Sequence, residues 1–170
     1  TLTPSKDTEK VVSIFSTSGA FAALKKDGSV QVWGSSNSGG EISSGVTTLV
    51  PSTDAKKVVS IYSAGDVGGA FAALKMDGSV QVWGLSSWGG DISSGVYVIT
   101  PSTDAEKVVS IFSTAAAFAA LKMDGSVQVW GASSWGGEIS SGITTLTPSK
   151  DTEKVVSIFS TYSAFAALKM

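Results

Sequence analysis

The side chains that could do chemistry in this 170-residue sequence recur at matching places along the chain. A carboxylate follows a Gly-Gly pair three times, at Glu41, Asp91 and Glu138. A tryptophan stands three residues before two of them, at Trp88 and Trp135. A ring of carboxylates could bind Ca²⁺ or a basic partner, and tryptophans in polar loops could contact a partner protein. We interpret these five residues as candidate partner-binding residues.

The carboxylates lack the spacing of a metal centre. Each Gly-Gly pair is followed by one acid, and none of these acids belongs to an Asp-x-Asp pair. We therefore expect no metal ion and no cofactor. A second acidic series, Asp27, Asp77 and Asp124, precedes glycine each time, which is typical of tight turns.

The chain lacks the residue types that carry most enzyme chemistry. It has no Cys and no His, and all 12 cationic side chains are Lys, so Arg is missing as well. No Ser stands in a Gly-x-Ser-x-Gly motif, and no Gly-rich segment has the phosphate-binding pattern. We therefore expect no catalytic residues and no enzyme activity. The missing arginine and a formal net charge of -2 also argue against a nucleic-acid partner.

The given chain contains no transmembrane span and no signal peptide. Its uncharged runs are short and interrupted by Ser or Thr, whereas a span needs about 20 apolar residues. The sequence thus indicates no compartment. It begins with Thr1 rather than Met, and residues 1–26 nearly repeat residues 145–170. We expect both ends to be open and the chain to be a fragment of a longer one.

An internal repeat organises the whole sequence. The string VVSIF or VVSIY recurs at steps of 47, 50 and 47 residues, beginning at Val11, Val58, Val108 and Val155. This predicts a single repeat array over residues 1–170. Its units cover about residues 11–57, 58–107 and 108–154, with a partial unit at 155–170, and residues 1–10 end a preceding unit. The middle unit is three residues longer, near residues 65–68.

Each unit is expected to form about four short strands. KVVSIFS, AFAALK and SVQVWG are rich in β-branched, apolar and aromatic residues, and short strands are expected near residues 46–50 and 96–100. The polar PSTDAEK segment is compatible with one helical turn, and the Gly/Ser segment after Trp-Gly is expected to be loop. If Asp27-Gly28 forms a two-residue type I′ turn, Ala22 faces Trp33. Both faces of the hairpin are then largely apolar, which predicts a sheet covered on both sides.

The apolar residues of these hairpins form the expected core. We expect burial of Trp33, Trp83 and Trp130, of Phe21, Phe71 and Phe118, and of Leu24, Leu74 and Leu121. Trp88 and Trp135 lie instead in Ser/Gly loops, where partial exposure is expected. Four strands in each unit of this length, covered on both faces, indicate an all-β fold of β-propeller-type blades, here a partial propeller.

The segment FAALKMDGSVQVWGLSSWGGDI resembles the repeat of the regulator of chromosome condensation family. Trp-Gly pairs beginning at Trp83, Trp88, Trp130 and Trp135 match that repeat, whereas Ser38 replaces the aromatic residue in the first unit. The resemblance covers about three and a half repeats and implies a seven-bladed β-propeller. The units are a little shorter than the usual family repeat, and Gly-Gly-acid-Ile replaces its Gly-Gln-Leu-Gly. No residue of the family's nucleotide-exchange surface can be placed on these units, so that activity does not carry over.

A second resemblance stays open at this point. Three Gln-x-Trp motifs, ending at Trp33, Trp83 and Trp130, are similar to the repeats of ricin-type β-trefoil lectins. The sequence therefore supports three functions: a protein-interaction scaffold, a carbohydrate-binding lectin, or an accessory subunit that stabilises a large native complex. As partners we expect another protein or further repeats of its own chain. We expect the isolated piece not to be a stable monomer, because unpaired strand edges invite association.

Overall fold

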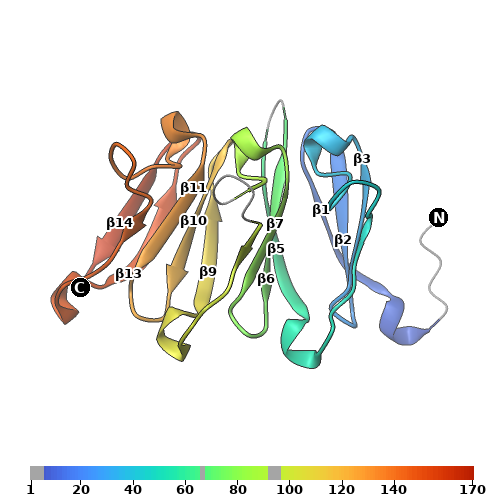
Figure 1. Ribbon diagram of the computed structural model, residues 1–170, viewed down its shortest axis with the longest axis horizontal. Helices are drawn as coiled ribbons and strands as arrows, with labels where there is room; N and C mark the ends of the chain where they lie inside the picture. Colours follow the sequence, from blue (N-terminus) through green and yellow to red (C-terminus); the bar gives the residue numbers. More distant parts are fainter. Residues whose placement is uncertain (1–5, 66–67, 92–96) are drawn as a thin grey trace.

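The computed structural model describes residues 6–65, 68–91 and 97–170, and Figure 1 shows them as upright sheets standing side by side in chain order. Three antiparallel sheets have four strands each, and a fourth has two. The first contains β1 (Val11–Ser16), β2 (Ala20–Lys25), β3 (Val30–Gly34) and β4 (Thr48–Leu49). The second contains β5 (Val58–Ala64), β6 (Ala70–Lys75), β7 (Val80–Gly84) and β8 (Val98–Ile99). The third contains β9 (Val108–Ser113), β10 (Ala117–Lys122), β11 (Val127–Gly131) and β12 (Thr145–Leu146), and the last contains β13 (Val155–Ser160) and β14 (Phe165–Lys169).

Short 3₁₀ turns lie at both ends of the sheets. Three lie at the upper end in Figure 1, namely η2 (Ser36–Ser38), η4 (Ser86–Trp88) and η6 (Ser133–Trp135). Four lie at the lower end, namely η1 (Asp7–Glu9), η3 (Asp54–Lys56), η5 (Asp104–Glu106) and η7 (Asp151–Glu153). The lower set confirms the expected helical turn before each first strand. The upper set adds a turn inside a segment that was expected to be irregular. Within the described residues, no helix has the length and apolarity needed to cross a membrane.

The Asp-Gly hairpins turn through three residues rather than two. The backbone N–H of Lys25 donates to Ser29 O over 2.9 Å, and Gly28 takes a φ of +79°. Among the described residues only glycines have positive φ, so Asp27 cannot occupy the left-handed position that a type I′ turn requires. The carboxylate of Asp27 instead accepts hydrogen bonds from the N–H and hydroxyl of Ser29, at 2.9 and 2.7 Å. This confirms the turn role of the acid and corrects the turn type.

The longer turn shifts the hairpin register by one residue. Phe21 lies opposite Trp33, and Ala22 lies opposite Val32. The expectation that Ala22 faces Trp33 was therefore wrong, because Lys26 belongs to the loop rather than to the strand pair. Phe21 and Trp33 stack with ring centroids 5.5 Å apart, and the same pair recurs in the second and third sheets.

The core consists of layers between neighbouring sheets. At the first boundary, apolar side chains of the first sheet pack on apolar side chains of the second: Ala20, Ala22, Leu24, Val30 and Val32 against Val58, Ile61, Phe71, Ala73 and Trp83. Equivalent residues form the second and third boundaries. The expectation that the second and third sheets are covered on both faces is confirmed. Trp83 and Trp130 are each only 1% exposed, as predicted.

The first sheet departs from the expected core. Trp33 is 38% exposed and Phe21 is 45% exposed, so their predicted burial was wrong. Both lie on the face turned away from the second sheet, where their equivalents Trp83 and Phe71 are covered by the preceding sheet. The predicted fourth strands are present but reduced to two residues. Residues 66 and 67, in the predicted difference of the middle unit, and residue 96, in a predicted strand, lie outside the described residues.

Candidate interaction surface

Because the strands of each sheet are antiparallel, their connecting turns lie at two opposite ends of the molecule, and these two ends differ chemically. We call the end with the Asp-Gly turns and η1, η3, η5 and η7 the lysine end, and the opposite end, with η2, η4 and η6, the loop end. Backbone hydrogen bonds join the two parts of the lysine end: Asp27 N–H donates to Thr8 O, and Asp77 N–H donates to Ala55 O, both over 2.9 Å. The candidate residues Trp88, Trp135, Glu41, Asp91 and Glu138 all belong to the loop end.

The Gly-Gly pairs fix the loops of this end to the next sheet. Gly39 has a φ of +92°, and a Cβ there would lie 2.6 Å from Phe71 Cδ2. Its carbonyl oxygen accepts a hydrogen bond from Trp83 Nε1 over 3.1 Å. A Cβ on Gly40 would lie 2.3 Å from the carbonyl oxygen of Gly34. Both glycines are therefore packing positions, and their constant spacing from Trp-Gly was the signal of this role in the sequence.

The 3₁₀ turns η4 and η6 each end on a tryptophan. The backbone N–H of Trp135 donates to Ala132 O over 3.0 Å, and Thr114 Oγ1 donates to Trp135 O over 2.9 Å. Trp88 N–H donates to Leu85 O in the same way, over 3.0 Å. The backbone of each tryptophan is thus anchored within its own unit. Both side chains remain partly exposed, as the sequence predicted.

Three aromatic rings from three successive sheets form a continuous row. The rings of Trp88 and Trp135 stack with centroids 6.5 Å apart and planes 27° apart. Tyr162 meets Trp135 edge-on at 5.0 Å. We call these three residues the aromatic row. Tyr162 is 61% exposed, and its carbonyl oxygen accepts a hydrogen bond from Ala115 N–H over 2.9 Å. Sequence reasoning missed Tyr162, because it lies in the turn between β13 and β14, where the repeat varies: the equivalent residues are Ser18 and Ala115.

The three carboxylates are not brought together. Glu41 Oε2 accepts a hydrogen bond from Gly45 N–H at 3.2 Å, and Glu138 Oε2 accepts one from Gly142 N–H at 3.5 Å. Each glutamate thus closes its own loop, and Asp91 occupies the equivalent position in the second unit. No group of three or more metal-ligating side chains occurs in the described part of the chain.

Two hollows border the glutamates but not the aromatic row. Glu41 lines a hollow of about 420 Å³ together with Trp83 and Tyr97. Glu138 lines one of about 220 Å³ together with Ile139 and Phe165. The aromatic row and the carboxylates are therefore separate features of the same end.

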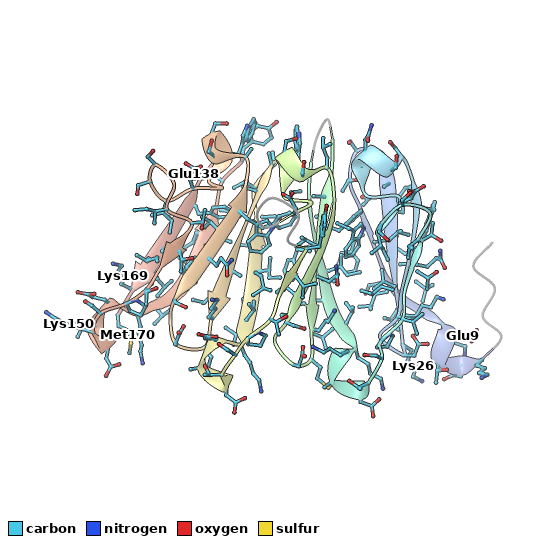
Figure 2. The ribbon with its side chains drawn as sticks, in the orientation of Figure 1. Glu9, Lys26, Glu138, Lys150, Lys169 and Met170 are labelled. Atoms are coloured by element: carbon cyan, nitrogen blue, oxygen red, sulfur yellow. The ribbon has the colours of Figure 1, made fainter. Side chains whose placement is uncertain are left out.

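Charge divides sharply between the two ends. Figure 2 shows Glu138 beside the upper loops, with Lys26 and Lys150 at the lower end. At the lysine end, ion pairs join neighbouring side chains, such as Lys57 Nζ and Asp54 Oδ1 at 2.8 Å. The hydrogen bond from Lys57 lowers the pKa of the Asp54 carboxyl below its ordinary value. The described residues of the loop-end loops include acids but no lysine.

The fold matches solved structures, although no family model and no curated protein sequence matches the chain. Human WBSCR16 aligns over 94% of this chain, with a TM-score of 0.60 and 21% identity. Prp20p from Saccharomyces cerevisiae, studied for its binding to Gsp1p and histones, aligns over 94% with a TM-score of 0.63 and 17% identity. Yeast RCC1 (Prp20), solved with Kap60 bound to it, gives a TM-score of 0.62 at 17% identity.

The chain spans only 44% of the length of WBSCR16 and of Prp20p. Both are RCC1-type β-propeller proteins. The resemblance inferred from the Trp-Gly pattern is thereby confirmed at the level of fold. Side-by-side four-stranded sheets are the arrangement of propeller blades. They favour the β-propeller fold over the β-trefoil alternative. The chain therefore has the blade fold of the RCC1-type β-propellers.

Proposed function

We propose that this chain is a non-enzymatic protein-interaction scaffold that contacts its partner through the loop end. The aromatic row carries the proposal. Trp88, Trp135 and Tyr162 come from three successive sheets, and their rings form one partly exposed surface held on anchored turns. Tryptophan and tyrosine are the side chains that most often dominate protein interfaces, because they bury large areas with few rotatable bonds.

The solved neighbours and the residue inventory support this proposal. Prp20p was studied for its binding to Gsp1p and histones, and yeast RCC1 was solved with Kap60 bound to it, so proteins that contain this fold bind other proteins in those cases. The sequence contains no His, Cys or Arg with which to build a common acid, base or anion clamp. A binding role needs none of these groups.

The lectin alternative loses its main support. Its Gln-x-Trp motifs end on Trp33, Trp83 and Trp130, and the last two are buried between sheets. The indole Nε1 atoms of Trp83 and Trp130 are also occupied by backbone carbonyl oxygens, at 3.1 and 3.2 Å. These two rings cannot serve as sugar platforms without opening the core.

A second candidate function, an accessory subunit that stabilises a larger assembly, is favoured by a different surface. Ile14, Phe21 and Trp33 form an exposed apolar face on the first sheet, and Phe159 and Leu168 are exposed on the last. In the middle sheets the equivalent positions are covered by a neighbouring sheet. We propose that another protein or further repeats of the same chain cover these faces.

A protein array tests the scaffold proposal. The biotinylated full chain is compared with the double variant W88S/W135S, in which both tryptophans become the serine that the first unit carries at position 38. We expect a reproducible set of array proteins that bind the wild type but do not bind the variant. An identical pattern of bound proteins for both chains, with both chains folded, would contradict it.

A further inference from the structure

The described residues of the loop end include carboxylates, whereas the lysines lie at the opposite end of the sheets. Glu41, Asp91 and Glu138 lie at the loop end, whereas all 12 lysines belong to the lysine end, in or beside the Asp-Gly turns and the 3₁₀ turns before each first strand. At the lysine end, by contrast, acids pair with Lys, as in Lys107–Asp104 at 2.7 Å. Such a one-signed surface attracts ligands of the opposite charge and repels those of its own.

The aromatic row lies within this negative field. Trp135 stands three residues before Glu138 and Trp88 three residues before Asp91, so their Cα atoms are at most about 11 Å apart. The part of an indole face that no neighbouring ring covers also attracts a cation, through the negative charge of the ring surface. The carboxylates and the indoles therefore favour the same kind of ligand, one that carries Lys or Arg.

The spacing of the rings favours an extended ligand. The centroids of Trp88 and Trp135 are 6.5 Å apart. In an extended strand, side chains on one face repeat every second residue, roughly 6.6–6.8 Å apart. Two successive same-face side chains of a strand-like peptide can thus each meet one indole. Tyr162, edge-on to Trp135 at 5.0 Å, lengthens the surface on that side.

We propose that the loop end binds an extended peptide segment with Lys or Arg at every second position, its cationic side chains contacting the exposed parts of Trp88 and Trp135. The proposal rests on the scaffold function above and names the partner class of that surface. Glu41, Asp91 and Glu138 act at longer range, where they raise the local concentration of the cationic segment rather than pairing with it ion by ion.

Fluorescence anisotropy on the full chain tests the proposal with labelled peptides of defined pattern. The main probe alternates Lys and Ser. Comparison peptides contain the same residues as one Lys block followed by one Ser block, or alternate Glu and Ser. The chain is tested as wild type, as W88S/W135S and as E41Q/D91N/E138Q. The matched control is D54N/D104N/D151N, which removes the same charge from exposed acids at the lysine end.

We expect the alternating Lys peptide to bind the wild type, and raised salt to weaken it because exposed charges are screened. Affinity should fall by about tenfold or more in W88S/W135S and in E41Q/D91N/E138Q, because the indole contacts or the local field are lost. The lysine-end control should stay within about twofold of wild type. The block peptide should bind more weakly than the alternating one, and the Glu peptide should not bind.

Three results would overturn the inference: no binding of the alternating Lys peptide, equal losses in the two charge variants, or unchanged binding to W88S/W135S. These failures are distinguishable from failure of the scaffold proposal. If array proteins without cationic segments still bind through the two tryptophans, the scaffold stands and the cationic partner class falls. If neither peptides nor array proteins depend on these tryptophans, both proposals fall.

Discussion

The indole Nε1 of Trp130 donates a hydrogen bond to the carbonyl oxygen of Gly89 across a sheet boundary, over 3.2 Å. Trp83 makes the equivalent bond to Gly39 at 3.1 Å. Each buried tryptophan thus ties its sheet to the loop of the preceding unit, one residue beyond the η turn. The turn that ends on Trp88 is therefore positioned by the core, whereas the turn that ends on Trp135 is held by Thr114 of its own unit. The repeat has two kinds of tryptophan, one that is buried and holds the sheets together and one that is partly exposed at the loop end.

Removal of a buried tryptophan should be costly. The Trp83→Ala variant loses a fully buried indole and its hydrogen bond, and the cavity left behind should lower the free energy of unfolding by about 3–5 kcal/mol. Urea unfolding measures this loss. The control Trp33→Ala affects a partly exposed ring and should cost less than about 2 kcal/mol. A loss below about 1 kcal/mol for Trp83→Ala would show that the packing between sheets is wrong.

The Gly-Gly loops provide a second stability test with an internal control. Gly39→Ala strains a backbone φ of +92° and forces a methyl group to 2.6 Å from Phe71 Cδ2. Gly45→Ala strains a φ of +74° but meets nothing within 4 Å. The left-handed conformation costs an alanine about 1–2 kcal/mol, so Gly45→Ala should lose about that much and Gly39→Ala clearly more. Thermal unfolding of both variants checks the order, and equal losses would exclude the close contact with Phe71.

Low pH should reduce the folding stability of the second unit, because it protonates Asp77. Burial raises the pKa of its carboxyl, but hydrogen bonds from Lys56 and Ser79 outweigh burial and lower the pKa from 3.8 to about 2. Because the folded pKa lies below the unfolded one, the stabilisation is complete above about pH 4 and disappears as the pH falls through about 2. Lys56 Nζ lies 2.6 Å from Asp77 Oδ2, and both groups are partly exposed, so the ion pair should contribute about 1 kcal/mol after screening.

The variant Lys56→Gln isolates this ion pair. We expect it to lose about 1 kcal/mol at neutral pH and to show a smaller further loss than wild type between about pH 4 and 2. Urea unfolding across this pH range provides the measurement. Lys57→Gln, whose partner Asp54 is exposed and therefore strongly screened, serves as the control and should change the acid dependence less than Lys56→Gln does. Identical acid profiles for wild type and Lys56→Gln would show that Asp77 has no effective cation partner.

The sequence predicted the repeated elements well and their exact pairing less well. The strands were visible as apolar runs around Asp-Gly, because β propensity and turn chemistry are local. The register at Asp27-Gly28 was wrong by one residue, because two-residue and three-residue loops both accept Asp-Gly and only the backbone hydrogen bond of Lys25 with Ser29 distinguishes them. That one residue decides whether Trp33 faces Ala22 or Phe21.

The candidate site was predicted only in part, because sequence patterns show local features and do not show the contacts between sheets. Trp88 and Trp135 were recognised from their Ser/Gly surroundings, which are local, and the structure brings their rings together. Tyr162 was missed because its contact with Trp135 depends on the packing of two sheets. The exposure of Trp33 was missed because its sequence surroundings equal those of Trp83 and only its position in the first sheet differs.

The exposed faces of the first and last sheets should make the isolated chain associate. Ile14 and Leu168 are 58% and 55% exposed, although both are branched apolar side chains on sheet faces. Residues 1–170 expressed alone should not form a stable monomer, since such faces and unpaired strand edges invite contact with other chains. Light scattering gives the mass, and calorimetry gives the melting behaviour. A monodisperse monomer with a sharp, cooperative melt would contradict this expectation.

Hydrogen–deuterium exchange tests the location of the binding surface most directly. The chain is measured alone and with the protein that binds it most strongly on the array. We expect slower exchange on binding in residues 85–91, 132–138 and 161–164, which carry the aromatic row and its anchored turns, and no change in the Asp-Gly turns of the lysine end. Protection confined to the lysine end, or to the exposed face of β1–β3, would contradict the assignment of the loop end as the interaction surface.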